Sequence, residues 1–198
     1  MNKKIVFIFG IICIIIFLIF YYIFCITGNN IIRNQNEFVE DMLKDLEEYE
    51  ANIEVTIRSN KNENTYSMYQ IVDEEYSKLL VNSPENVRGL EIELKDGKLK
   101  MINEKTNMEK IYENYETIIN NDLFINSFID EYKKYEVEIS ENEVEIIVKV
   151  EREENKNIYI KSKELYLDKK TRLPKKLLLK DNSQNINTSI IYTDIKIK

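Results

Sequence analysis

Apolar and polar residues alternate along most of the chain after residue 50, and this feature constrains the fold more than any other. A period of two is typical of a β-strand that buries one face and exposes the other. Turn residues punctuate the alternation, and the pair Asp96-Gly97 is typical of a two-residue hairpin loop, in which glycine tolerates a positive φ. The pattern predicts about nine or ten strands joined mostly by hairpins, hence an antiparallel sheet.

Two segments have helical spacing instead, residues 34–50 and residues 121–134. Asn121 or Asp122 is expected to cap the second helix. The apolar positions of residues 107–119 fit a helix, but the asparagines and tyrosines weaken that pattern, so this segment is not assigned. The apolar positions of the two helices are Phe38, Met42, Leu43, Leu46 and Tyr49, then Leu123, Phe124, Phe128, Ile129 and Tyr132. The expected fold class is α+β, with a large, curled antiparallel sheet and the helices against its apolar face.

Two details of the later strands concern their phase. The apolar positions change phase between Ser162 and Glu164, which predicts a β-bulge at that point. The alternating positions Ile191, Thr193, Ile195 and Ile197 are expected to form the last strand.

An uncharged stretch, Ile5–Ile26, precedes the alternating region. As a helix it would span about 33 Å, close to the thickness of the hydrocarbon core of a bilayer, so we predict one transmembrane helix. Lys3 and Lys4 precede it and a single arginine follows closely, which by the positive-inside rule leaves the N-terminus in the cytoplasm. The predicted organisation is a membrane anchor over residues 1–30 and an extracytoplasmic domain over residues 31–198.

Two other interpretations compete with an uncleaved signal-anchor. A cleaved signal peptide has a shorter apolar region, of about 7–15 residues, followed by small residues, whereas this one ends in Phe24, Cys25 and Ile26. A lipoprotein-type signal would place lipid on Cys25, but lipidation is disfavoured because Phe24 stands where a small residue normally precedes the modified cysteine. Cys13 and Cys25 are interpreted as small apolar residues of a membrane helix, and with no later cysteine the outer domain contains no disulfide.

The outer domain is acidic. Of the 28 basic residues, Lys3 and Lys4 precede residue 31, which leaves 26 against 35 acidic residues and a net charge of −9 for the domain. This balance argues against nucleic acid as a partner and against electrostatic binding to anionic lipid headgroups. A basic protein partner is compatible with it, although acidity also serves simply to keep such a domain soluble.

The chain contains no histidine and four glycines, which excludes the usual catalytic triads, most zinc sites and a phosphate-binding loop. A pair of carboxylates is the catalytic option that is left, since Glu138 and Glu145 are expected opposite each other on the polar face of one hairpin, beside Glu136 and Glu143. An exposed hairpin face does not raise a carboxyl pKa, so this face is interpreted as solvated or partner-binding, with weak Ca²⁺ capture as a minor alternative. We expect no catalytic residue, no cofactor and no metal site.

A curved sheet covered by helices either packs its apolar residues into a core or leaves a hydrophobic cavity between sheet and helix. The sequence alone does not decide between these. The residues expected to line such a cavity, or to form its lid, are Ile53, Val55, Ile57, Met68, Ile92, Leu123, Phe124, Phe128 and Tyr132.

The stretch LYLDKKTRLPKKLLLKD, residues 165–181, contains a strand, Asp168, a turn with Thr171, and Pro174 at the start of the next strand. It resembles the L-x-L-D-x-x-T-x-x-P segment of LolA-like lipoprotein carriers. With the segments YEANIEVTIRSNKNENTYSMYQ, LEIELKDGKLKMIN, NNDLFINSFIDEYKKY and SIIYTDIKIK, it is similar to the clostridial germination lipoproteins of the GerS type. The resemblance covers most of residues 49–198. In physical terms, Asp168 can accept backbone hydrogen bonds in the turn, and Pro174 fixes φ where the next strand begins.

The resemblance implies a half-open β-barrel with helices against its concave face and no enzymatic activity. GerS-type proteins support a cell-wall amidase that modifies the spore cortex, which implies a membrane-tethered binding protein for a cell-wall hydrolase or other envelope protein in sporulation or germination. The alternative is a carrier or sensor of lipid acyl chains or lipoproteins. Phe24-Cys25 departs from the lipidation motif of the family, so Ile5–Ile26 is expected to replace the lipid as the tether.

Overall fold

The computed structural model describes residues 17–19, 21–22, 36–74, 76–113, 122–152 and 160–198. The chain divides into two compact units, Met1–Asp41 and Met42–Lys198. Among the described residues no helix is long and apolar enough to cross a membrane. Most of Ile5–Ile26, with Cys25, lies outside them, so the anchor, its cleavage and its lipidation stay predictions.

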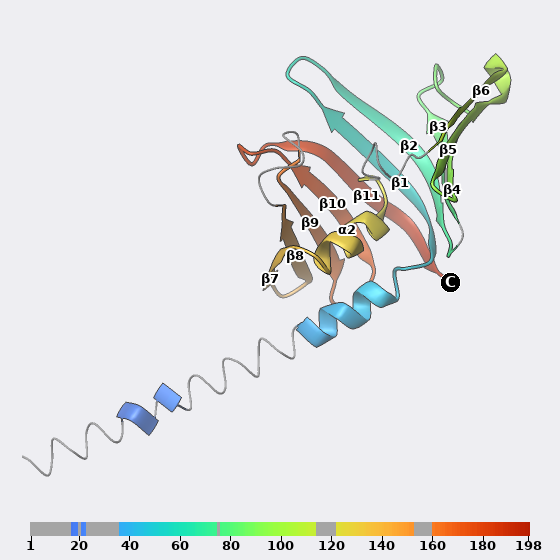
Figure 1. Ribbon diagram of the computed structural model, residues 1–198. Helices are drawn as coiled ribbons and strands as arrows, with labels where there is room; N and C mark the ends of the chain where they lie inside the picture. Colours follow the sequence, from blue (N-terminus) through green and yellow to red (C-terminus); the bar gives the residue numbers. More distant parts are fainter. Residues whose placement is uncertain (1–16, 20, 23–35, 75, 114–121, 153–159) are drawn as a thin grey trace, which may run out of the picture. The chain divides into compact units, whose positions relative to one another are not determined.

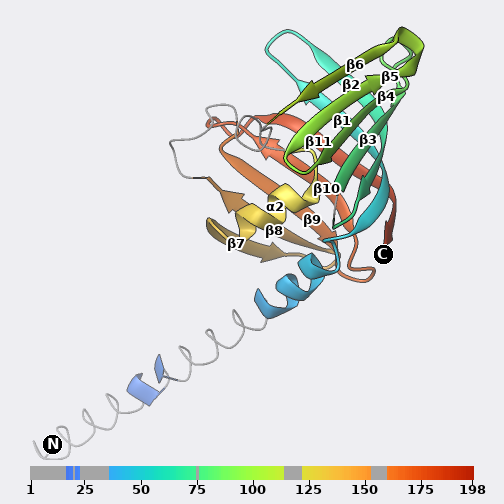
Figure 2. The ribbon, with the colours of Figure 1, turned by 45° about the vertical axis from the view of Figure 1, so that its right-hand side comes forward.

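The second unit is built on one antiparallel sheet of 11 strands in the order β6-β5-β4-β3-β2-β1-β11-β10-β9-β8-β7. Figures 1 and 2 show this sheet curving between its two border strands, β6 and β7, which do not pair with each other. The strands are β1 Tyr49–Arg58, β2 Glu63–Val72, β3 Tyr76–Ser83, β4 Leu90–Lys95, β5 Lys98–Asn103, β6 Met108–Tyr112, β7 Glu136–Glu141, β8 Glu145–Glu151, β9 Ser162–Asp168, β10 Pro174–Lys180 and β11 Ile186–Ile197. The predicted antiparallel α+β class is confirmed, and the sheet is open.

The tight turn between β4 and β5 forms as predicted. Asp96 and Gly97 both adopt positive φ, of 50° and 69°, and Lys95 pairs with Lys98 across the loop. These are the dihedrals of the hairpin turn that matches the twist of its strands. The ambiguous residues 107–119 begin as a strand, β6, and the remainder from residue 114 lies outside the described residues.

The helices are shorter than predicted. Residues 36–44 are helical, and the predicted continuation to residue 50 is wrong because Tyr49 already begins β1, where burial alternates. The second helix, α2, is Ile125–Tyr132, and a short 3-10 turn, η1, spans Glu104–Thr106. The N-cap of α2 is Phe124, without a side-chain hydrogen bond, so the predicted cap by Asp122 is wrong, and Asn121 lies outside the described residues.

The side of the sheet that carries the odd-numbered residues of β1 is termed the inner face, and α2 lies on this side, within the curve of the sheet (Figure 2). In β1 and β8–β11, termed the covered half, most inner positions are almost inaccessible to solvent, and the exposed exceptions, Ile57 and Ile197, lie near strand ends. The buried positions include Tyr49, Ala51, Val55, Val148, Val150, Leu165, Leu177 and Ile190, each 0% exposed. In β4–β6, termed the open half, Ile92 and Met101 are only half-buried and Met108 is 38% exposed.

The turn between β9 and β10 confirms the expected roles of Asp168 and Pro174. The Oδ1 atom of Asp168 accepts hydrogen bonds from the backbone N–H groups of Lys170 and Thr171, at 2.9 and 2.8 Å, and from the Thr171 hydroxyl at 3.1 Å. Pro174 is the first residue of β10. A proline is tolerated at that position because it needs no ladder N–H group.

The bulge predicted between Ser162 and Glu164 is wrong. The pairing of β8 with β9 runs without a shift from Glu145–Asp168 to Glu151–Ser162. Strand β9 therefore keeps its phase, and Lys163 points to the inner face together with Leu165 and Leu167. The register shift that does occur nearby lies in β10, between Pro174 and Lys176.

Candidate functional site

The inner face beneath α2 gathers most of the residues predicted to line a cavity or form a lid. Ile53, Val55, Met68, Phe124 and Phe128 are all buried, at 7% exposure or less. Ile53 and Met68 are direct cross-strand partners in β1 and β2. The inner face of β1 and β2 therefore combines buried apolar side chains with the buried aromatic rings of Phe124 and Phe128.

The other predicted residues of this group lie at the margins. Ile57 is 40% exposed near the end of β1, where the β1–β2 hairpin begins its turn. Ile92 is half-buried in β4, and Leu123 and Tyr132 are half-buried at the two ends of α2. Whether the group encloses a ligand cavity stays a prediction.

The N-terminus of α2 is fixed to the sheet by side chains of β1 and β2. The hydroxyl of Tyr49 donates to Oε1 of Gln70 at 2.7 Å and accepts from the backbone N–H of Ile125 at 3.2 Å. Gln70 in turn donates to the carbonyl of Leu123 at 3.1 Å. A side chain of the sheet thus satisfies a helix N–H that has no partner within the helix. Burial raises the pKa of the Tyr49 phenol well above its usual range, so the hydroxyl keeps its proton.

A buried cluster of four charges holds the same helix to β8 and β9. Lys163, 0% exposed, lies 2.8 Å from Oδ1 of Asp122 and 3.0 Å from Oε1 of Glu131. Arg152, just after β8, forms ion pairs with the same two carboxylates. Lys163 also donates to the hydroxyl of Ser127 at 2.8 Å. Two cations and two anions balance, so the cluster adds no net charge to the core.

The electrostatics of this cluster are those of fixed ion pairs. Burial by itself would lower the pKa of Arg152, but its hydrogen bond to Glu131 and the charge of Asp122 raise that pKa above its usual range. Buried ion pairs of this kind add little net stability, but losing one partner is costly because it strands a charge. The cluster therefore sets where α2 lies on the sheet.

This cluster was not predicted from the sequence, although the sequence contains one signal of it. Lys163 occupies the apolar phase that Leu165 and Leu167 share, and the predicted bulge removed it from the interior. Glu131 likewise follows Phe128 on the buried side of α2. A lysine and a glutamate at positions where the pattern expects buried apolar residues indicate a buried ion pair, because neither charge is stable in the core alone.

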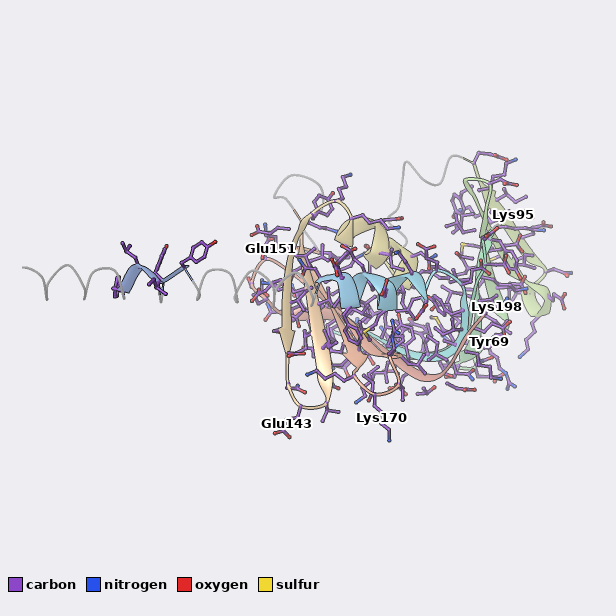
Figure 3. All side chains as sticks on the ribbon, turned by 90° about the horizontal axis from the view of Figure 1, so that it is seen from below. Tyr69, Lys95, Glu143, Glu151, Lys170 and Lys198 are labelled. Carbon is purple, nitrogen blue, oxygen red and sulfur yellow. The ribbon has the colours of Figure 1, made fainter. Side chains whose placement is uncertain are left out.

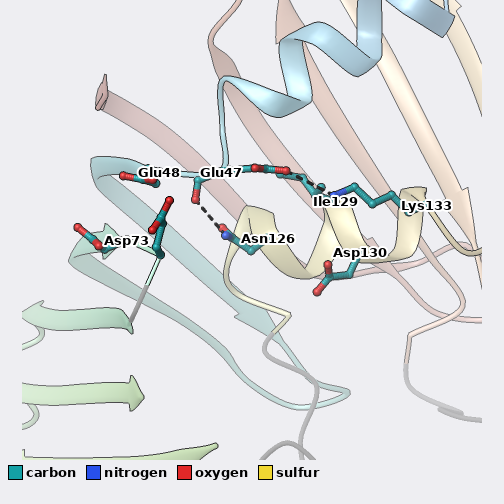
Figure 4. A pocket seen from close by; sticks show the side chains of 8 residues that line it. Glu47, Glu48, Asp73, Asn126, Ile129, Asp130 and Lys133 are labelled. Atoms are coloured by element: carbon teal, nitrogen blue, oxygen red, sulfur yellow. Dashed lines mark hydrogen bonds and ion pairs between the residues drawn. The ribbon is translucent and has the colours of Figure 1, made fainter. Parts of the chain in front are cut away.

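A shallow pocket of about 310 Å³ lies where the start of β1, the end of β2 and α2 meet (Figure 4). The Nδ2 atom of Asn126 donates to the carbonyl of Glu47 at 3.1 Å, and Lys133 pairs with the Glu47 carboxylate at 3.4 Å. The pocket is lined by Glu47, Glu48, Asp73, Glu74, Asn126, Ile129, Asp130 and Lys133. Its lining makes this corner of the domain acidic.

The carboxylate pair considered as a catalytic option does not form. Glu138 faces Lys149 in the β7–β8 pairing, and Glu145 faces Asp168 in β9. The loop explains the difference: Oδ1 of Asn142 accepts the N–H groups of Val144 and Glu145, both at 2.8 Å, so the return strand starts only at Glu145. In the described part of the chain, no group of three or more acidic or cysteine side chains is arranged to hold a metal ion.

A family comparison covers nearly the whole sequence. The model of the family described as sporulation protein YdcC-like matches residues 3–198. The chain belongs to the YdcC-like sporulation protein family. Among curated protein sequences, none matches this chain significantly.

Solved structures show a similar fold in proteins of low sequence identity. The chain is similar to the structure described as the CwlD amidase from Clostridioides difficile in complex with the GerS lipoprotein, with a TM-score of 0.54, 21% identity, and 84% of this chain and 95% of that chain covered. It is also similar to an uncharacterized conserved protein from Thermus thermophilus, with a TM-score of 0.54, 10% identity and coverages of 83% and 88%. A LolA superfamily protein from Nitrosomonas europaea matches with a TM-score of 0.42, 11% identity and coverages of 81% and 93%.

These comparisons confirm the resemblance that the β9–β10 segment suggested. The family is one of sporulation proteins, and the open antiparallel sheet is the fold shared with the solved structures. The match starts at residue 3, so it includes the apolar segment Ile5–Ile26 as well as the sheet.

Proposed function

We propose that this protein is a membrane-tethered, non-enzymatic binding protein that supports a cell-wall hydrolase or another envelope protein during sporulation or germination. The observation that carries the proposal is the family match over residues 3–198, which joins an apolar N-terminal segment to this sheet in a family of sporulation proteins. The GerS lipoprotein, of similar fold, is found in complex with an amidase, which supports a protein partner of that class.

The covered half is built as a scaffold. Its inner face is occupied by α2, whose position the Tyr49–Gln70 pair and the buried charges define. These ion pairs and the hydrogen bonds of Tyr49 join the helix to the sheet, so their role is structural. Partner binding is the function that such a rigid, open sheet serves best.

The proposed function is tested on the full-length chain with an affinity tag at its C-terminal end, produced in sporulating cells of the organism that encodes it. After mild detergent extraction we expect a cell-wall amidase or other envelope protein to co-purify in stoichiometric amount. Recovery of the chain without any such protein would contradict the proposal.

The proposed location needs its own test. In spheroplasts, added protease is expected to digest the sheet domain while the membrane is intact. Protection of the domain until the membrane is broken would contradict an extracytoplasmic position.

A second candidate function is the binding of lipid acyl chains, and the open half favours it. Leu90, Ile92 and Met101 on its inner face are half-buried and Met108 is exposed, so apolar surface there lacks full cover among the described residues. Native mass spectrometry of the detergent-solubilised chain would show a bound acyl-chain mass if this function holds. A chain that carries only detergent would rule it out.

A further inference from the structure

Strand β7 forms one border of the sheet and pairs on one side only. Val137 faces Val150 and Ile139 faces Val148 in β8, while among the described residues no strand pairs with the other side of β7. A border strand leaves a row of N–H and C=O groups without ladder partners, and these can pair with an added strand. The backbone of β7 is therefore able to accept an extended segment.

The outer face of this border carries more acids than bases. Glu136 and Glu138 stand at alternate positions of β7, with Glu151 beside them in β8. Lys149 is shared between Glu138, at 3.7 Å, and Glu151, at 3.3 Å, and no ion pair of Glu136 occurs within the described residues. The Glu138 side chain is 73% exposed. These residues, with Val137, line a groove of about 340 Å³.

The two ends of the β7–β8 hairpin extend this surface. Figure 3 shows Glu143 in its loop and Glu151 at its far end, on the side of the domain away from Tyr69 and Lys95. Glu143 is exposed. A border strand, a groove and a row of carboxylates thus coincide on one hairpin.

We propose that β7 is the docking edge for an extended segment of the envelope partner, in which lysine or arginine alternates with apolar residues. An antiparallel strand added to β7 would bring its basic side chains opposite Glu136 and Glu138 on the outer face. Its apolar side chains would lie beside Val137 and Ile139 on the inner face, because directly opposed residues share a face. This inference rests on the proposed function and names the chemistry of the partner.

The same charges prevent a wrong pairing. If β7 of a second copy paired with this edge, glutamates would stand opposite or diagonal to glutamates, which is unfavourable. A basic segment is accepted and a second copy of the chain is rejected, so one row of residues supplies both attraction and selectivity. The acidic residues of the segment 136–145, EVEISENEVE, thus allow the border strand to distinguish a basic segment from a second copy of the chain.

The first test uses the full-length chain in an uncharged detergent and a synthetic peptide of about six residues, the usual strand length, in which lysine and valine alternate. We expect binding by fluorescence anisotropy and slower hydrogen exchange at the β7 amides. The same peptide with N-methyl groups at alternate residues keeps its charge but cannot form the ladder, and is expected not to bind. Absence of binding by the unmethylated peptide, or equal binding of both peptides, would overturn the proposal.

Two matched double variants locate the site. The variant Glu136→Lys with Glu138→Lys is expected to lower peptide affinity about tenfold or more, since two attractive cross-strand pairs become repulsive. The variant Glu109→Lys with Glu113→Lys changes net charge equally near the opposite border, where these residues pair with Lys100 and Lys98, and is expected to keep the affinity. Equal losses in both variants would show general charge attraction and overturn the assignment to β7. Thermal unfolding of each variant confirms that it folds.

The same variants separate this inference from the proposed function. If the unmodified chain captures its amidase or other envelope partner and the β7 variant captures it equally well, the docking edge is wrong while the proposed function stands. If the unmodified chain captures no partner but still binds the basic peptide at β7, the proposed function is wrong, while the inferred ability of β7 to bind a basic extended segment stands. Loss of the partner in the β7 variant alone supports both.

Discussion

The covered half and the open half of the sheet have the same alternation of apolar and polar residues, yet they bury it very differently. Leu165 and Leu177 of the covered half are 0% exposed, whereas Ile92 and Met101 of the open half are half-buried and Met108 is 38% exposed. The difference follows α2, which lies on the inner face and is hydrogen-bonded to β1 and β9, while Leu123 just before it is hydrogen-bonded to β2. Alternation selects the face that can be buried, and the covering element decides whether it is.

The largest expected effect tests the packing beneath α2. Phe128→Ala removes a fully buried aromatic ring and is expected to lower the free energy of unfolding by about 3–5 kcal/mol. Met101→Ala in the open half is expected to cost about 1–2 kcal/mol, since part of that side chain already contacts water. Chemical denaturation of both variants measures the two losses in free energy of unfolding. Equal losses would contradict the distinction between the covered and the open half.

The buried charges provide the second test. Lys163→Ala leaves Asp122 and Glu131 with Arg152 alone, and we expect a loss of about 3 kcal/mol because a buried carboxylate loses its cation.

The control is Lys100→Ala in the open half, where the pair with Glu109 at 3.1 Å is largely exposed and is expected to contribute less than about 1 kcal/mol. A Lys163→Ala variant as stable as Lys100→Ala would show that the cluster does not fix α2.

The third test concerns the helix N-terminus. Tyr49→Phe keeps the ring but strands the Ile125 N–H and the Gln70 carbonyl, which is expected to cost about 1–3 kcal/mol. Tyr69→Phe on the outer face removes a hydroxyl bonded to Glu50 at 2.6 Å, and its effect is expected to be smaller because water replaces the partner. Thermal unfolding distinguishes them, and the reverse order would contradict the assigned role of Tyr49.

The smallest effect is expected in the β9–β10 turn. The backbone N–H of Thr171, followed by Lys175, lowers the pKa of Asp168 from 3.8 to about 2. A lowered folded-state pKa stabilises the fold above the unfolded value, so this contribution is present above about pH 4 and is lost as pH falls toward 2. Asp168→Asn is expected to remove that part of the acid sensitivity, measured as Tm against pH. Identical profiles for both proteins would contradict it.

Much of the fold was predictable because local chemistry and tertiary structure agree in it. The turns at Asp96-Gly97 and at Asp168–Pro174 are determined by the residues that form them. Ile53, Val55 and Phe128 are buried, as their spacing along strand and helix indicated. The helix over residues 34–50 was predicted too long because Tyr49 fits a helical stripe and a strand equally well.

The remaining errors concern register and charge, which depend on distant residues. The last strand forms as predicted, but its alternation does not continue through Thr193. The pairing of β1 with β11 shifts register between Asn52 and Ile53, so Ile190 and Tyr192, and not Ile191, are buried. Lys163 could be assigned to the core only with its partners Asp122 and Glu131 in view, and those lie on another element. The loop around Asn142 displaced Glu145 from Glu138 in the same way.

The pairing of β1 with β11 sets the order in which this domain can be completed. Thr193 of β11 donates to the carbonyl of Asn52 in β1 across 141 residues of chain, and the two strands are neighbours in the middle of the sheet. As the chain emerges, the hairpins from β1 to β6 can form from local contacts, but β1 keeps one open side until β11 arrives, and contacts of such long range form slowly. During that interval β1 is an exposed edge strand, so a chaperone or an early-bound partner that shields β1 would limit wrong pairing until β11 closes beside it.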